Sequence, residues 1–124
     1  MINDQLLQWL LEGDVSVQYQ VQRELIGSAE PALRDRIASE GWGARFLAAR
    51  QENGHWGQGF YQPKWISSHY TLLDLRHLDL PRDHPVPAET ISLILRDQKA
   101  EDGGINPGKT IKESDVCING MFLT

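Results

Sequence analysis

The sequence has little cysteine, with Cys117 as the single thiol among 124 residues. One thiol cannot form a disulfide within the chain, and this fits a reducing compartment, so we expect a cytoplasmic location. Long apolar runs are also lacking, since none approaches the roughly 20 residues that cross a bilayer. The N-terminal segment has neither the basic start nor the small-residue cleavage site of a signal peptide. We therefore expect no membrane span.

Positive charge is scarce as well. Twelve Lys and Arg stand against seventeen Asp and Glu, which gives a formal net charge of −5. Such a chain lacks the basic face that binds nucleic acid or an anionic membrane, so we expect no nucleic-acid partner. Hydrophobic residues make up 40% and charged residues 23%, values typical of a globular domain, and the length suits one domain with a modest core.

Strand patterns are missing, and the apolar residues follow helical spacing instead. Val17, Val21 and Leu25 recur at i, i+4 and i+8, which is one face of a helix. Pro31 suits the first turn of another helix. We therefore predict an all-α fold. The predicted helices cover residues 3–13, 14–27, 30–41, 42–51, 65–80, 88–98 and 113–124.

Two of these helices allow a prediction of the face that they bury. In the helix over 42–51, Trp42, Phe46 and Leu47 are expected to face the core. In the helix over 88–98, the expected inward residues are Ile91, Ile94 and Leu95. The segment 81–87 between helices is rich in proline and is predicted as a connection.

A turn motif occurs twice, with a period near 50 residues. The Asn-Gly pair at 53–54 aligns with the Asp-Gly pair at 102–103, and both pairs tolerate the positive φ that a tight turn needs. The large apolar residue two positions later is Trp56 in the first turn and Ile105 in the second. A two-helix unit of this period predicts a helical array, in which both residues are buried between neighbouring hairpins. Alternatively, Trp56 stacks on a ligand. The predicted repeat units are roughly 1–27, 31–80 and 85–124.

The turns resemble those of a known superfamily. RQENGHWG (50–57) and AEDGGINPG (100–108) are similar to the turn motif of the terpenoid cyclases and protein prenyltransferases. The longer stretch from Gly41 to Leu75, together with SDVCINGMFL (114–123), resembles prenyltransferase or squalene-cyclase-like repeat proteins. This resemblance implies an (α/α)6 toroid, with paired helices in two concentric rings around an apolar cavity.

The length of the chain covers only part of such a ring. Twelve helices of roughly 11 residues with their loops need well over 200 residues. We therefore expect one incomplete domain over residues 1–124, a partial toroid of about two and a half repeats. Its open faces are expected to self-associate, because large apolar patches favour association. The cavity is expected to take a hydrophobic small molecule.

The resemblance also implies a metal site and a catalytic acid. In protein prenyltransferases, a similar Asp-x-Cys at the start of an inner helix supplies two zinc ligands and a later histidine supplies a third. Asp115 and Cys117 match the first pair, and the histidine would lie beyond Thr124. Asp115 is accordingly a candidate catalytic residue and zinc a possible cofactor. The alternative is that Asp115 is an acidic residue at a helix start and Cys117 a small buried hydrophobe.

A histidine and several aromatic residues are the candidates for a substrate site. His69 occupies the place of Cys117 one repeat earlier, and it is a candidate general base. Tyr61, Trp65 and Tyr70 are candidate substrate-binding residues, because aromatic walls stabilise carbocations by cation–π interaction. The alternatives are a hydrogen-bonded histidine of the inner ring and aromatic packing under a loop.

The acidic motifs of terpene chemistry are missing. Neither the Asp-Asp-x-x-Asp that binds diphosphate with Mg²⁺ nor the Asp-x-Asp-Asp of the cyclases occurs. The scattered bases are candidates for contact with a diphosphate, and the alternative is that they are solvated: Lys64, Arg76, Lys109 and Lys112. The resulting hypothesis is a prenyltransferase- or squalene-cyclase-like protein for an isoprenoid or other hydrophobic ligand. The alternative is a protein-binding scaffold without catalysis, since GDVSVQYQVQREL (13–25) also resembles a HEAT-type helix.

Overall fold

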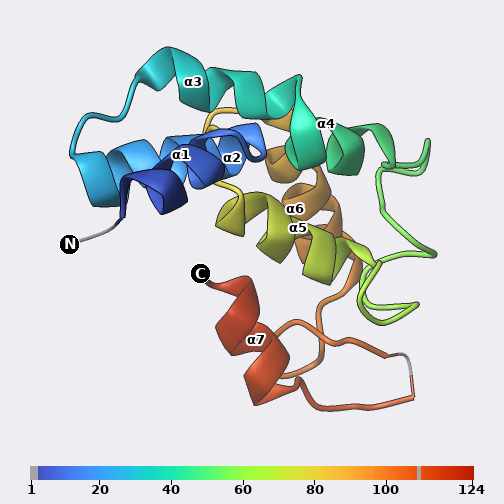
Figure 1. The fold of residues 1–124 in the computed structure, drawn as a ribbon. Helices are drawn as coiled ribbons and strands as arrows, with labels where there is room; N and C mark the ends of the chain where they lie inside the picture. The colour runs from blue at the N-terminus through green and yellow to red at the C-terminus, as the bar shows by residue number, and fades with distance from the viewer. Residues whose placement is uncertain (1–2, 109) are drawn as a thin grey trace. The chain divides into compact units, whose positions relative to one another are not determined.

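The protein is helical throughout the part that the structure describes. The computed structural model describes residues 3–108 and 110–124 (Figure 1). The helices are α1 (Asp4–Leu11), α2 (Val15–Val21) with a π-helical extension (Gln22–Ile26), α3 (Pro31–Asp35) with a 3-10 extension (Arg36–Ala38), α4 (Gly41–Ala48), α5 (Ser68–His77), α6 (Pro85–Asp97) and α7 (Val116–Phe122). Within these residues the only extended pairing is an isolated bridge between Lys99 and Ile105. The all-α prediction is therefore confirmed. None of the helices described combines the length and apolar character that a bilayer span needs.

The contacts of the chain group it into two compact units. The first unit comprises Met1–Ala48 and Leu75–His84, and the second comprises Ala49–Asp74 and Pro85–Thr124. These boundaries differ from those of the repeat units inferred from the sequence, which stay a prediction.

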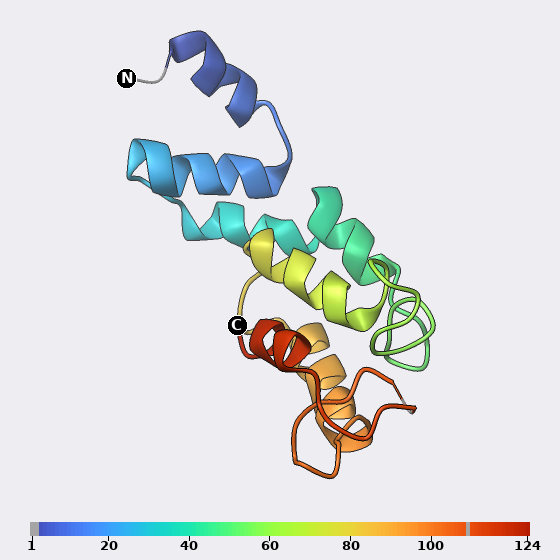
Figure 2. The ribbon, with the colours of Figure 1, turned by 90° about the horizontal axis from the view of Figure 1, so that it is seen from below.

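The first unit is built on α1, α2 and α3. The side-chain oxygen of Asn3 accepts from the backbone N–H of Gln5 at 2.8 Å, which caps α1. The π-helical extension of α2 ends at Gly27, whose φ of 77° stops the helix. Figure 2 shows α2 lying between α1 and α3. The buried apolar residues of this unit are Val15, Tyr19, Val21, Leu33, Ile37, Leu75 and Leu80.

The start of α4 is held closely against the rest of the first unit. The carboxylate of Asp14 accepts from the backbone N–H of Trp42 at 2.9 Å. A Cβ at Gly43 would lie 2.2 Å from the carbonyl oxygen of Ile37, so only glycine permits this approach. The prediction that Trp42 faces the core is wrong: this side chain is 53% exposed and packs on Phe46, with ring centroids 6.2 Å apart. The backbone of α4, rather than its tryptophan, makes the close contact.

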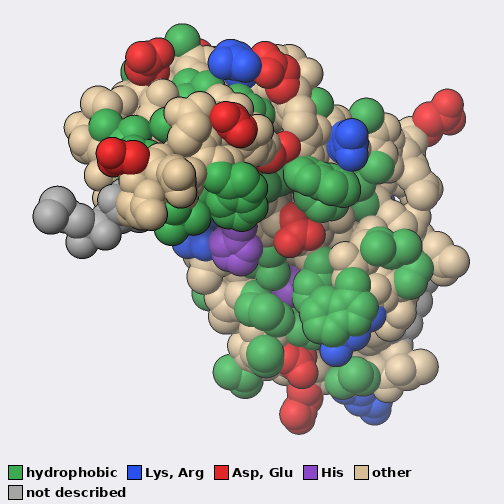
Figure 3. Space-filling model, in the orientation of Figure 1, with side chains coloured by type: hydrophobic (Ala, Val, Ile, Leu, Met, Phe, Trp, Pro, Cys, Tyr) green, Lys and Arg blue, Asp and Glu red, His purple; other side chains and the backbone are tan. Residues whose placement is uncertain are grey.

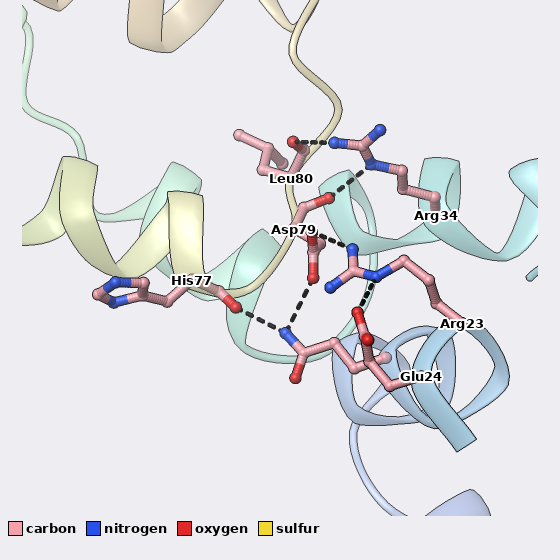
Figure 4. A network of polar contacts seen from close by, with 7 residues as sticks. Arg23, Glu24, Arg34, His77, Asp79 and Leu80 are labelled. Atoms are coloured by element: carbon pink, nitrogen blue, oxygen red, sulfur yellow. Dashed lines mark hydrogen bonds and ion pairs between the residues drawn. The ribbon is translucent and has the colours of Figure 1, made fainter. Parts of the chain in front are cut away.

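Asp79 joins three segments of the first unit (Figure 4). Its carboxylate accepts from Arg23 Nη1 at 2.6 Å and from Gln20 Nε2 at 3.0 Å, and its carbonyl accepts from Arg34 Nε at 3.0 Å. Hydrogen bonding to Asp79 is the main cause that raises the pKa of the Arg23 guanidinium. The residues that follow α5 are thereby fixed to α2 and α3.

The second unit has a small apolar core. Its buried centre is formed by Phe60, Ile94, Ile105 and Ile118, which come from the loop before α5, from α6, from the second turn and from α7. Partly buried side chains that pack against this centre are Tyr61, Leu72, Met121 and Phe122. Because these four residues come from four separate segments of the chain, this core depends on contacts between residues that are far apart in the sequence.

The buried face of α6 differs from the predicted one. Ile94 is fully buried, as expected, but Ile91 and Leu95 are 36% and 43% exposed, so their predicted inward position is wrong. The hydroxyl of Thr90 donates to the carbonyl of Gly54 at 2.8 Å. Because Thr90 and Ile94 are four residues apart, they share one face of the helix, and this bond turns that face inward. Ile91 and Leu95, each one position further along, then face solvent.

The helix α5 is shorter than predicted at both ends. The sequence predicts a helix over 65–80, whereas α5 spans Ser68–His77. Trp65 has a φ of 77° and Asp79 a φ of 62°, and these left-handed conformations are incompatible with a continuing α-helix.

The two predicted turns share the same local geometry. Gly54 and Gly103 have φ values of 83° and 85°. The side-chain oxygen of Asn53 accepts from the backbone N–H two residues later at 3.0 Å, and that of Asp102 does the same at 2.9 Å. Both residues thus form the Asx turn that their type favours.

The closing bonds of the turns are also equivalent. Each turn is closed by a backbone bond of 2.8 Å, from the N–H of residue 51 to the carbonyl of 55 and from the N–H of 100 to the carbonyl of 104. A basic side chain before each turn, Arg50 or Lys99, donates to the carbonyl of the left-handed glycine, at 3.1 and 3.0 Å. The repeat of the motif in the sequence is therefore also a repeat of hydrogen bonding.

The large apolar residue after each turn is buried, as predicted. Trp56 is 2% exposed and Ile105 is 4% exposed. The backbone N–H of Trp56 donates to Ser68 Oγ at 3.0 Å, and that of Ile105 donates to Asn119 Oδ1 at 2.7 Å. In both cases the next helix of the motif supplies the side chain that fixes the buried residue.

Candidate functional site

The structure brings four of the predicted site residues together in the second unit. Backbone bonds attach the preceding loop to the start of α5, including one from the N–H of His69 to the carbonyl of Phe60 at 2.9 Å. This places Tyr61 next to the histidine, while Trp65 and Tyr70 lie on either side of the helix start in sequence. We refer to Phe60, Tyr61, Trp65, His69 and Tyr70 as the aromatic cluster.

The rings of the aromatic cluster form a connected series. The imidazole of His69 lies 5.6 Å from the ring centroid of Phe60, 5.7 Å from that of Tyr61 and 5.0 Å from that of Tyr70. Tyr70 in turn lies 4.8 Å from Trp65. His69 is 1% exposed and Trp65 is 67% exposed, so the cluster extends from the interior of the unit to solvent.

Burial shifts the pKa values of two groups in the aromatic cluster, the His69 imidazole and the Tyr70 hydroxyl. It lowers the pKa of His69, so the imidazole is neutral at pH 7. Burial, together with the hydrogen bond of 3.1 Å between the Tyr61 and Tyr70 hydroxyls, raises the pKa of Tyr70 to about 12. The electrostatic interaction with Cys117 makes a smaller contribution to the raised pKa of Tyr70. A neutral imidazole can accept or donate a proton, and this is compatible with the predicted role of His69 as a base.

Two buried polar atoms lack hydrogen-bond partners in the described residues. One belongs to the residue just before α5 and the other to the first turn of α5. They are Ser67 Oγ and His69 Nε2. Leaving a buried donor or acceptor without a partner costs roughly 1–3 kcal/mol, so each such atom requires an explanation. The predicted site residue His69 is one of the two.

A serine–histidine pair near the aromatic cluster was not anticipated from the sequence. His55 Nδ1 lies 2.9 Å from Ser68 Oγ, and burial lowers the pKa of His55. Such a pair resembles the nucleophile and base of a hydrolase. However, Ser68 is fully buried, and its hydroxyl accepts from the N–H of Trp56, as Asn119 does in the second turn. The repeated bond indicates that Ser68 fixes the turn rather than attacking a substrate.

Asp115 and Cys117 lie at the start of α7. The carboxylate of Asp115 accepts from the backbone N–H of Ile118 at 2.9 Å, so it caps the helix. Cys117 is exposed. Among the described residues, no three His, Cys, Asp or Glu side chains are grouped to hold a metal ion. A protein zinc site takes at least three such ligands. The donor set on the described residues is therefore too small for zinc.

Among the scattered bases considered for a diphosphate, Lys64 contacts the aromatic cluster. Its Nζ lies 4.9 Å from the ring centroid of Trp65. Lys112 is exposed, and Arg76 is an exposed residue of α5. Lys109 lies outside the described residues.

The first unit contains an open cleft that the sequence did not suggest. Its volume is about 350 Å³, which is at the lower end of the range for ligand sites. The lining residues are Tyr19, Ala29, Pro31, Arg34, Asp35, Pro81, Arg82 and Asp83. Arg34, on one side, lies over the ring of Tyr19 at 5.8 Å and bonds to the carbonyl of Asp79, so it is engaged in the fold.

Comparison of the chain with family models, with curated proteins and with solved structures gives no match.

Proposed function

We propose that the protein binds an isoprenoid or another hydrophobic small molecule through the aromatic cluster. The observation that carries this proposal is the series of rings from the buried His69 through Tyr70 to Trp65, whose indole is 67% exposed. An exposed indole in tilted contact with a half-buried ring offers an apolar molecule both contact area and a polarisable surface. Ile66, the next residue in sequence, is also exposed, at 62%.

The proposed architecture is a partial toroid of the terpenoid cyclase and prenyltransferase type. The repeated turns support this architecture, because a helical array of this kind has an equivalent turn in each successive repeat. If the protein is also an enzyme, His69 and Asp115 are the residues proposed to act on the ligand. A cytoplasmic location is part of the same proposal, and cell fractionation tests it.

The test is binding of farnesol, a C15 isoprenoid alcohol, followed by tryptophan emission and by calorimetry. Covering the exposed part of the Trp65 indole contributes roughly 2 kcal/mol. Trp65→Ala should therefore weaken farnesol binding about 30-fold.

Trp42→Ala is the matched control. Like Trp65, Trp42 is more than half exposed and has a cation over its ring. Arg45 lies 4.9 Å from the Trp42 ring centroid, and Lys64 lies 4.9 Å from that of Trp65. This variant should bind farnesol as the wild type does. Equal losses in both variants, or no binding to the wild type, would refute the proposal.

A protein-binding scaffold is the second candidate, favoured by the exposed residues of α7. Val116 and Leu123 are 88% and 86% exposed at the two ends of this helix, and Figure 3 shows hydrophobic side chains gathered over its region on the viewed face. We propose that these residues also support self-association of the chain, since exposed apolar surface favours it. A scaffold without a small-molecule ligand would leave Trp65 emission unchanged by farnesol.

A further inference from the structure

We infer that the ligand of the aromatic cluster carries an uncharged hydroxyl or carbonyl group, which forms a hydrogen bond with His69 Nε2. This inference rests on the proposed function and adds to it the chemistry of the polar end of the ligand. It follows from three properties of the cluster: a buried nitrogen without a partner among the surrounding rings, a gradient of exposure along those rings, and the absence of a charged group among them.

The first property is the buried nitrogen itself. His69 is 1% exposed, and its Nε2 has no hydrogen-bond partner in the described residues. Rings of Phe60, Tyr61 and Tyr70 lie within 5.7 Å of the imidazole centroid. None of them bonds to Nε2, and the two tyrosine hydroxyls are paired with each other at 3.1 Å. The partner that this nitrogen lacks is therefore one that the cluster does not supply.

The second property is the gradient of exposure. Trp65 is open to solvent and contacts Tyr70, which contacts His69. In the proposed complex, an elongated apolar molecule packs on Trp65 and Tyr70, and its leading end reaches the imidazole, which is closed to solvent in the structure. A hydroxyl or carbonyl at that end satisfies the nitrogen, whereas a hydrocarbon leaves it without a partner.

The third property is charge. The five residues of the cluster include no carboxylate, lysine or arginine, and the imidazole is held neutral by burial. A diphosphate placed at His69 would be buried without a counter-charge, which is costly. The cation in contact with the cluster, Lys64, lies over the exposed indole at its outer end. A neutral polar group is therefore the one that fits the interior end.

Three C15 probes with the same isoprenoid skeleton test the inference: farnesene, farnesol and farnesyl diphosphate. The wild type should bind farnesol roughly tenfold more tightly than farnesene, because only the alcohol satisfies the buried nitrogen. His69→Phe keeps an aromatic ring and removes both nitrogens. This variant should bind farnesol and farnesene equally.

Ser67→Ala is the matched control, since it removes the other unpartnered polar atom and leaves His69 intact. It should keep the preference for farnesol. Loss of the preference in this variant instead of His69→Phe would overturn the assignment to His69.

A measurement on the unmodified protein tests the inference without depending on the folding of a variant. In nitrogen-15 spectra of the histidines, farnesol should shift the Nε2 resonance of His69 and farnesene should not. Equal binding of farnesol and farnesene by the wild type, or tighter binding of farnesyl diphosphate than of farnesol, would overturn this inference alone. Failure of all three probes to bind would overturn the proposed function as well.

Discussion

At the scale of single residues, two left-handed glycines carry the repeated turns, but their surroundings differ. A Cβ at Gly54 would lie 2.5 Å from Leu93 Cδ1, whereas one at Gly103 would meet nothing within 4 Å. The backbone conformations are nearly the same, with φ values of 83° and 85°. Alanine substitutions at the two glycines therefore separate the free-energy cost of the left-handed conformation from that of steric contact.

We predict that Gly103→Ala lowers the free energy of unfolding by about 1 kcal/mol, the usual cost of placing an L-residue in this conformation. Gly54→Ala should cost about 2 kcal/mol, because the side chain of Leu93 must also shift. Urea unfolding followed by circular dichroism measures both variants. Equal losses would mean that Leu93 moves without cost.

The buried imidazole of His69 predicts a dependence of stability on pH. Burial lowers the pKa of His69 from its usual 6.5, so the unfolded chain binds this proton more readily than the folded one. The contribution of the neutral histidine is thus fully present above about pH 6.5, and it is lost as the pH falls through the lower pKa of the folded state.

His69→Phe should therefore lose less stability than the wild type between pH 7 and pH 5. At pH 7 its free energy of unfolding should be close to that of the wild type or higher, since an unpartnered nitrogen is replaced by carbon. Urea titrations at the two pH values provide the measurement. An unchanged pH dependence in the variant would show that His69 is not the titrating group.

At the scale of helices, capping residues have different amounts of tertiary contact. Asp14 caps α2 through Ser16 and also accepts from the backbone N–H of Trp42 at the start of α4. Burial opposes the ionisation of this carboxyl, but the hydrogen bonds outweigh burial and lower the pKa of Asp14. Asp115 makes one capping bond, to Ile118 in its own helix.

We predict that Asp14→Ala lowers the free energy of unfolding by about 2 kcal/mol, because it removes both a cap and a bond between helices. Asp115→Ala should cost about 1 kcal/mol, the usual value for a cap alone. Chemical denaturation of the two variants provides the comparison. A smaller loss for Asp14 than for Asp115 would contradict the proposed tie between α2 and α4.

Helix positions were largely predictable from the sequence, whereas helix ends and faces were less so. Asn3 and Pro31 mark helix starts by local chemistry that acts within one turn. The proline-rich composition of 81–87 predicts a connection, yet Pro85 begins α6, because the missing N–H of a proline is not needed in the first turn of a helix. The inward position of Thr90 could not be predicted, because its bond to Gly54 joins residues that are far apart in the sequence.

At the scale of the whole molecule, exposed apolar side chains and net charge have opposite effects on association. The exposed large hydrophobic residues are Leu6, Trp9, Leu25, Ile26, Trp42, Trp65, Ile66, Ile91, Leu95, Ile111, Val116 and Leu123. They favour association, whereas a formal net charge of −5 opposes it. Self-association should therefore strengthen with added salt, which screens the repulsion.

We predict that the double variant Val116→Glu with Leu123→Lys weakens self-association. The two new charges cancel, so the net charge stays at −5, and each suits its end of α7. Sedimentation velocity over a range of concentrations should show a shift toward monomer relative to the wild type. A wild type that is monomeric at every concentration would refute the proposed association.

The sequence alone determined the helical class, the two turns and the burial of Trp56 and Ile105. These features depend on spacing and on local backbone preferences, which act over a few residues. Only the tertiary structure decided that His69 lies among aromatic rings with an unpartnered nitrogen and that Trp42 lies in solvent. The physical reason is that burial and missing hydrogen-bond partners depend on segments brought together from distant parts of the chain, which residue spacing does not encode.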